Sequence, residues 1–209
     1  MKKYLIFIII SILTSCSLEK KDSNNFITKA IPTNSELIIK FHDINKIYQE
    51  INTFEWWKQL KKTDLFHENL NLLDELNKDY QIEELFLNQN TYLSAKPSIG
   101  QKINFLFITS ITDVQIKSHK LMRTINSSLN KPRNYEGIQI NNIEGHSNIY
   151  FAYYENIFLL SFSPILIEES IRKLKSIHDI FQSDPIKKLS QNLPKYSDIN
   201  IILKTPLLE

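Results

Sequence analysis

Alternating apolar residues predict a series of β-strands along the 209-residue chain. In the segment over 35–41, Leu37, Ile39 and Phe41 fall on one face, because successive side chains of a strand point to opposite faces. The run over 103–110 is apolar on both faces, which is typical of a strand in the middle of a sheet. Further strands are predicted over 92–96, 137–143, 148–154, 157–162 and 198–203.

Apolar residues three or four apart predict helices between these strands. Three short helices are expected over 43–87, the first capped by Asp43 and the second carrying Phe54, Trp57 and Leu60 on its apolar side. A fourth, capped by Thr112 or Asp113, is expected to bury the stripe Val114, Leu121, Ile125 and Leu129.

Two more helices begin at Ser-Pro and Asp-Pro pairs, since proline fits the first helical turn. Ser163-Pro164 precedes a helix that is expected to bury Ile167, Ile171 and Leu174, with Glu168/Arg172 and Glu169/Lys173 pairing on its outer face. Asp184-Pro185 precedes a shorter helix through Leu189.

The order of these elements predicts an α+β fold, with a mixed, largely antiparallel sheet and helices packed on it. The folded domain is expected over 30–209. Short connections support the antiparallel pairing: Glu155-Asn156 fits a two-residue hairpin turn, and Gly100, Gly137 and Gly145 are expected at turns.

The segment over 194–204 resembles the one over 32–40. In both, Pro is followed three residues later by Ser, then by an acid and a β-branched run. Two interpretations stay open. The segment over 194–209 is either the start of a second repeat, or the last strand of one unit, which closes back on the first.

The first fifteen residues predict an export signal. Met1-Lys2-Lys3 is basic, and the apolar stretch over 4–13 is too short to span a bilayer comfortably. The polar segment after it, over 16–29, reads as a tether.

Leu13-Thr14-Ser15-Cys16 resembles the lipobox of bacterial lipoproteins. The resemblance implies cleavage between Ser15 and Cys16, diacylglycerol on the Cys16 sulfur, and acylation of the freed amine by a fatty acid such as palmitate. Several acyl chains anchor a domain stably to a membrane, whereas one is marginal. Ser17 is not the Asp that retains enterobacterial lipoproteins in the inner membrane, so the resemblance favours the outer membrane. The alternative is a conventional signal peptide with Cys16 as an ordinary residue.

Composition then excludes several classes of function. The whole chain has 25 basic and 23 acidic residues, and removing Lys2 and Lys3 with the signal leaves 23 against 23. A neutral chain lacks the basic footprint of a nucleic-acid-binding protein. One Cys allows no internal disulfide, and three Gly exclude most phosphate-binding loops.

No motif indicates an enzyme, a metal site or a cofactor. None of the histidines, His42, His67, His119, His146 and His178, has a partner at the spacing of a zinc site, and no Gly-x-Ser-x-Gly motif is present. A dispersed carboxylate pair would suit an envelope hydrolase; the densest acidic doublets are Glu83-Glu84 and Glu168-Glu169. Trp56 could stack on a glycan, while Trp57 matches the spacing of a core residue.

The body of the chain also resembles uncharacterised Bacteroidota lipoproteins that carry a domain of unknown function. The resemblance rests on Pro32 entering a strand, the Asp43 helix start, the segment that carries Phe54, Trp57 and Leu60, the segments over 135–140 and 158–163, and the helix that follows. It implies no catalytic residue. We therefore expect a lipid-anchored, non-catalytic module of the cell envelope that binds or assembles with an envelope protein or a glycan.

Lipid anchoring is testable directly. Cells that express the wild-type chain and are labelled with radioactive palmitate should incorporate label into it, and Cys16→Ala should lose that label because the acceptor sulfur is gone. Equal labelling of the two chains, or no label on wild type, would contradict the anchor.

Overall fold

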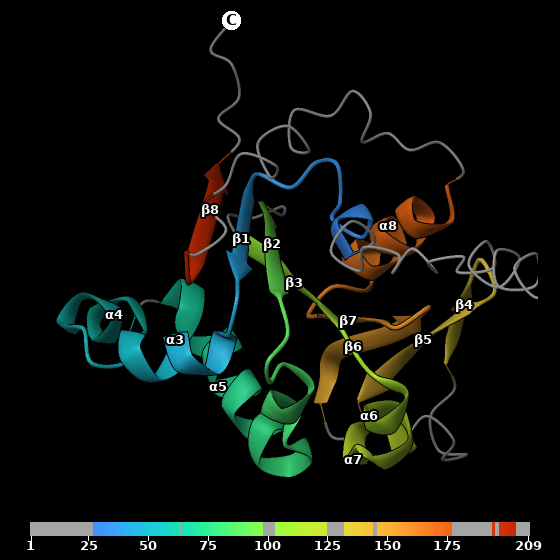
Figure 1. Ribbon diagram of the computed structural model, residues 1–209, viewed down its shortest axis with the longest axis horizontal. Helices are drawn as coiled ribbons and strands as arrows, with labels where there is room; N and C mark the ends of the chain where they lie inside the picture. Colours follow the sequence, from blue (N-terminus) through green and yellow to red (C-terminus); the bar gives the residue numbers. More distant parts are fainter. Residues whose placement is uncertain are drawn as a thin grey trace, which may run out of the picture.

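The computed structural model describes residues 27–62, 64–97, 103–124, 132–143, 146–176, 194 and 197–203. Its centre is an eight-stranded sheet of order β4-β5-β6-β7-β3-β2-β1-β8, and every pair of neighbouring strands is antiparallel (Figure 1). The strands are β1 (Leu37–Phe41), β2 (Thr91–Pro97), β3 (Ile103–Ser110), β4 (Arg133–Tyr135), β5 (Ile138–Ile143), β6 (His146–Tyr154), β7 (Ile157–Ser161) and β8 (Ile199–Leu203). The expected α+β class is confirmed.

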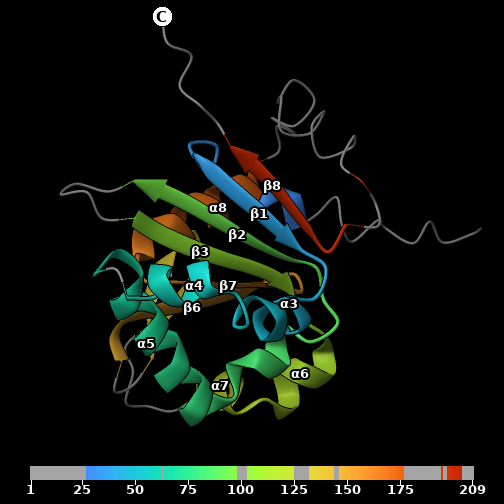
Figure 2. The same ribbon diagram turned by 90° about the vertical axis from the view of Figure 1, so that its left-hand side faces the viewer.

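Helices cover both faces of this sheet. They are α3 (Ile44–Ile51), α4 (Glu55–Leu60), α5 (Asp64–Tyr80), the 3-10 helix η1 (Ile82–Leu85), α6 (Asp113–Ser118), α7 (Lys120–Thr124) and α8 (Pro164–Lys175). Figures 1 and 2 show α8 on one face, and α5, α6 and α7 on the other. Helices α3 and α4 lie on the same side as α5, toward the β1–β8 end of the sheet.

Two buried clusters make up the core, one on each face. The first lies under α8 and joins Ile38 and Leu106 to Ile167 and Ile171. The second lies under α5, η1 and α7 and centres on Phe158, which contacts the rings of Phe86 and Phe151 at 6.3 and 6.0 Å between centroids. Strand β3 contributes to both, as its apolar pattern on both faces predicts.

β8 pairs with β1 along its whole length, from Leu37 opposite Leu203 to Phe41 opposite Ile199. This is the arrangement expected of a last strand that closes back on the first. The internal repeat stays a prediction.

Local sequence signals explain several element boundaries. The Asp43 carboxylate accepts a hydrogen bond from the Lys46 backbone at 3.2 Å, so the expected cap of α3 is present. Thr112 and Gln115 form a capping box at the start of α6. Glu155 and Asn156 both have positive φ, 45° and 65°, as a two-residue hairpin turn of this kind requires.

The predicted helix after Thr112 is broken into α6 and α7. His119 between them is extended and only 5% exposed, and its ring lies 3.1 Å from the Gln81 carbonyl oxygen. The ring also accepts a bond from the Leu121 backbone at 3.2 Å. This anchoring of His119 redirects the chain, so Leu121 is buried as expected, whereas Val114 is 72% exposed and its predicted burial is wrong.

Glu168 is predicted to lie on the outer face of α8, but it is buried, so this prediction is also wrong. Glu168 pairs with Arg133 at 2.8 Å, and Glu169 pairs with Lys96 at 3.2 Å. Arg172 donates two hydrogen bonds to the Tyr135 hydroxyl. These side chains therefore tie α8 to β2 and β4, and β4 itself is a short polar strand that alternation did not predict.

Several sequence predictions lie outside the described residues. They are the signal peptide and Ser15, Cys16 and most of the tether, the turns at Gly100 and Gly145, the stripe positions Ile125 and Leu129, and the helix from Asp184 to Leu189.

Leu106→Ala should destabilise the fold by about 2–5 kcal/mol, because Leu106 is fully buried on a central strand and the change leaves a cavity. Urea unfolding followed by circular dichroism measures this loss. Val114→Ala is the control and should change stability by less than about 0.5 kcal/mol, since Val114 is 72% exposed. Equal effects of the two changes would contradict the described core.

Candidate functional site

An apolar groove of about 800 Å³ lies between the β8-β1-β2-β3 part of the sheet and the helix α3. Its apolar lining comes from four strands, one helix and the turn after that helix: Leu37, Ile39, Phe41, Leu93, Ala95, Pro97, Ile103, Phe105, Ile199, Ile201, Ile47 and Phe54. A cavity of this size is typical of sites for small molecules. We call it the apolar groove.

The floor of the apolar groove is set by strand register. Leu203, Leu37, Ala95 and Phe105 face one another across four strands and form one row. Ile201, Ile39, Leu93 and Phe107 form the next row. Because neighbouring partners of an antiparallel pair share a face, both rows present a continuous apolar surface on the side of α3.

This floor continues the second core cluster rather than forming a separate surface. Phe107, at the end of the second row, packs against Phe86 of that cluster, with 6.3 Å between ring centroids. Toward β8 the helical cover thins, and Ile201 is 59% exposed. The apolar groove is thus the part of a core-forming face that the described helices leave accessible.

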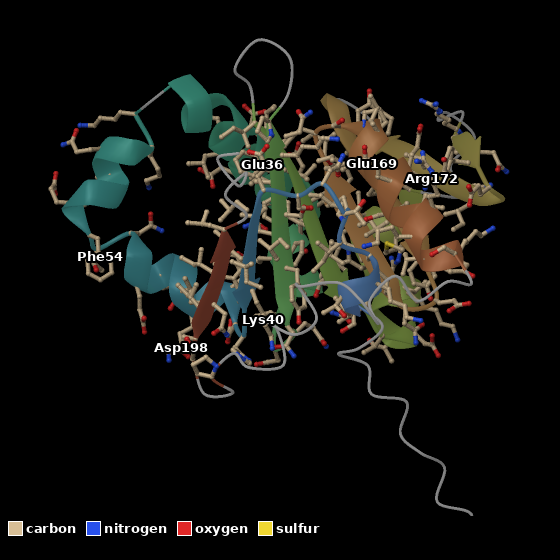
Figure 3. The ribbon with its side chains drawn as sticks, turned by 90° about the horizontal axis from the view of Figure 1, so that it is seen from above. Glu36, Lys40, Phe54, Glu169, Arg172 and Asp198 are labelled. Carbon is tan, nitrogen blue, oxygen red and sulfur yellow. The ribbon has the colours of Figure 1, made fainter. Side chains whose placement is uncertain are left out.

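The wall opposite the floor comes from α3 and the turn that follows it. Ile47 is buried, whereas Phe54 is 52% exposed. The Thr53 hydroxyl donates to the Glu50 carbonyl at 2.6 Å and closes the end of α3 just before Phe54. Figure 3 shows Phe54 on the helical side, away from β8. The expectation that Phe54 belongs to a buried stripe is therefore wrong, since it is a partly exposed lining residue.

Four charged residues, Glu36, Glu50, Lys96 and Asp198, also line the apolar groove. Asp198 pairs with Lys46 of α3 at 3.5 Å. Lys96 is held by Glu169 on the side of α8. The charged residues stand around an otherwise apolar floor.

A polar cluster lies on the other face of the same strands. Asn200, Lys40 and Tyr92 are directly opposite one another, with the Lys40 ammonium 5.9 Å from the centre of the Tyr92 ring. Burial raises the pKa of Tyr92 to about 12 and lowers the pKa of Lys40. In the part of the chain that the structure describes, the enclosed atoms His42 Nε2 and Asn200 Nδ2 have no hydrogen-bond partner.

The sequence-predicted chemistry is not assembled into an active site among the described residues. Glu83 bonds to the side chain of Asn77 at 3.0 Å, and Glu168 pairs with Arg133. Glu36 and Asp198 both line the apolar groove, but they lie toward opposite ends of the β1–β8 pair (Figure 3). Asp198 lies opposite His42, six residues along from Glu36, so the two acids are roughly 20 Å apart at about 3.3 Å per residue. A glycosidase pair is at most ~9.5 Å apart.

Neither a metal-binding cluster nor a membrane-spanning helix is found among the described residues. Within the described ranges, no group of three or more His, Cys, Asp or Glu side chains could hold a metal ion. No helix in those ranges is long and apolar enough to cross a membrane. The His119 ring lies between the Gln81 carbonyl and the Leu121 backbone, which is a structural role.

Trp56, the predicted glycan contact, lies in α4, next to the turn that carries Phe54. The side chains of Trp56 and Trp57 are outside what the structure describes. Sequence reasoning missed the apolar groove altogether. The available signal was the odd-numbered face of β1, whose apolar residues indicate burial equally well under a helix or under a ligand.

The enclosure of His42 gives a pH-dependent prediction. Burial lowers its pKa, the Lys40 ammonium lowers it further, and the Asp198 carboxylate opposes both effects. A lowered folded-state pKa means that the unfolded chain binds the proton more readily. Stability should therefore fall as pH drops through about 6.5, the ordinary histidine pKa, and level off below the folded pKa.

An NMR titration of the His42 ring should accordingly give a pKa below about 6.5. Lys40→Met should raise that pKa, because it removes a facing cation. His42→Gln should reduce the loss of stability between pH 7.5 and 5. A His42 pKa above the ordinary histidine value would contradict the enclosure.

Comparison with known proteins gives no family assignment: no family model, no curated protein and no solved structure matches this chain significantly.

Proposed function

We propose that this protein is a lipid-anchored, non-catalytic binding module of the bacterial cell envelope, and that it holds an apolar small molecule in the apolar groove. The observation that carries the proposal is the groove itself, with about 800 Å³ between a floor of aliphatic and aromatic side chains and the α3 wall. Each apolar carbon transferred from water to this floor contributes favourably, at about 25 cal/mol per Å² buried.

The shape of the site favours a small molecule over a protein partner. Protein interfaces are commonly broad, whereas ligand sites are concave and enclose most of the ligand. Ile47 and Phe54 line the apolar groove from the helical side and the strand residues line it from the sheet, so a ligand would contact protein on two sides. A flexible chain of carbons would fit such a groove.

The chemistry of the floor favours binding over catalysis. Hydrolysis needs polar groups that position water and stabilise developing charge. The floor rows consist of aliphatic and aromatic side chains, and two of the three lining carboxylates, Glu36 and Asp198, lie too far apart to act as a pair. A hydrolase is thus the weaker candidate, and glycan binding through Trp56 stays a prediction.

The proposed anchor agrees with such a role. Only ten residues, 17–26, lie between Cys16 and Ile27, where the described fold begins, and even a fully extended chain would place these two residues at most about 40 Å apart. The acyl chains on Cys16 would therefore keep the apolar groove near the membrane surface, where apolar and amphiphilic molecules are concentrated.

A fluorescent apolar probe tests the proposed function. N-phenyl-1-naphthylamine is uncharged and gains fluorescence in apolar surroundings. The mature chain, residues 16–209, carrying Cys16→Ser needs no detergent and should enhance this fluorescence in a saturable way. Ile201→Gln should weaken probe binding about tenfold, because it places an amide on the floor.

Ile165→Gln on α8 is the matched control. Ile165 is 60% exposed, as against 59% for Ile201, but it does not line the apolar groove. This variant should bind the probe as wild type does. Absence of saturable binding, or equal weakening by the two variants, would contradict the proposed function.

A further inference from the structure

The charges around the apolar groove are unbalanced in a way that bears on the ligand. Glu36 and Glu50 are exposed, and neither carboxylate has an ion-pair partner among the described residues. Glu50 belongs to the α3 wall, and Glu36 precedes β1 at the end of the floor nearest Leu37. Figure 3 shows Glu36 at the far end of β1 from Asp198.

The other lining charges are already compensated. Lys96 lies 3.2 Å from Glu169, with side chains only 29% and 20% exposed, so this cation is committed to α8. Asp198 is paired with Lys46 across a more exposed contact. Of the lining charges that the structure describes, the two without an ion pair are both negative.

We call the open side of the apolar groove, beside Glu36 and Glu50, its mouth. A negatively charged mouth above an apolar floor selects amphiphiles by the charge of their head group. The apolar floor has a low dielectric and water lies only on the open side, so the field of Glu36 and Glu50 is concentrated at the mouth. A cationic head there gains attraction while staying solvated. An anionic head, such as a carboxylate or a phosphate, meets repulsion from two acids and lacks a free lysine or arginine among the described lining residues.

We propose that the ligand of the apolar groove is a cationic amphiphile, with its hydrocarbon chain on the β8-β1-β2-β3 floor and its positively charged head beside Glu36 or Glu50. This inference rests on the proposed function and adds the ligand's charge to it. Charge complementarity at the mouth sets the preference, while the floor supplies most of the affinity.

Three amphiphiles that share a twelve-carbon chain test the charge alone. Dodecyltrimethylammonium, dodecanol and dodecanoate, each below its aggregation concentration, compete with bound N-phenyl-1-naphthylamine on the mature Cys16→Ser chain. The expected order of affinity is cation, then neutral, then anion. At low salt the affinity for the cation should be about tenfold higher than the affinity for the anion. In 1 M salt this cation-to-anion ratio of affinities should fall toward one, because the charges are screened.

Variants of the two carboxylates then show which of them lies nearer the bound head group. Glu36→Gln and Glu50→Gln should each lower the cation-to-anion ratio, the larger effect marking the carboxylate nearer the head, and the double variant should bring the ratio close to one. Probe binding itself should survive, because the floor is unchanged. Glu84→Gln, an exposed acid of η1 that does not line the apolar groove, is the control and should leave the ratio as in wild type.

The outcomes separate the two proposals. Failure of the neutral probe to bind wild type would overturn the proposed function, and this inference with it. If the probe binds but the three amphiphiles compete equally, or the anion competes best, the groove binds apolar molecules and the cationic preference is wrong. An unchanged ratio in the double variant would likewise overturn the role of these two carboxylates.

Discussion

The antiparallel pairing of β1 with both β2 and β8 is the constraint on which the rest of the structure depends. It fixes the face of the sheet on which each side chain of β1 lies. Ile38 faces the core under α8, whereas Leu37 and Ile39 face the apolar groove. A slip of one residue would exchange these two sets. The same hydrogen bonds therefore assemble the core and the floor of the site, so the site cannot form without the fold.

The uneven cover of that second face explains why a groove exists at all. Helix α5, η1 and α7 bury the β3-β7-β6 part through Leu76, Leu85 and Leu121, which are fully buried. Toward β8 the described cover reduces to α3 and the Phe54 turn. An apolar surface left in this way would cost free energy in water, and a ligand that covers it would recover that energy. Glu36 and Glu50 at its mouth add selectivity by charge.

Much of the fold was predictable because its signals are local. Alternation located seven of the eight strands, and Asp43 and Thr112 marked helix starts through hydrogen bonds that span only three residues. The break at His119 was not predictable, because its cause is a contact with Gln81, 38 residues away. Burial of Glu168 was hidden for the same reason, since Glu168 is in helix α8 and its partner Arg133 lies on strand β4, distant in the sequence. The groove was missed because Leu37, Ile39 and Phe41 have the pattern of a core face, and only three-dimensional packing shows that this face is left partly uncovered.

Isoleucine methyl NMR tests the central account most directly, because β1 and β8 carry isoleucines on both faces. With dodecyltrimethylammonium added to the mature Cys16→Ser chain, the methyl signals of Ile39, Ile199 and Ile201 should shift in a saturable way. Ile38 and Ile202, on the same strands but facing the core under α8, should stay in place. Shifts at Ile38 and Ile202 without shifts at Ile39 and Ile201, or no saturable shift at any of the five, would contradict the assignment of the groove as the binding site.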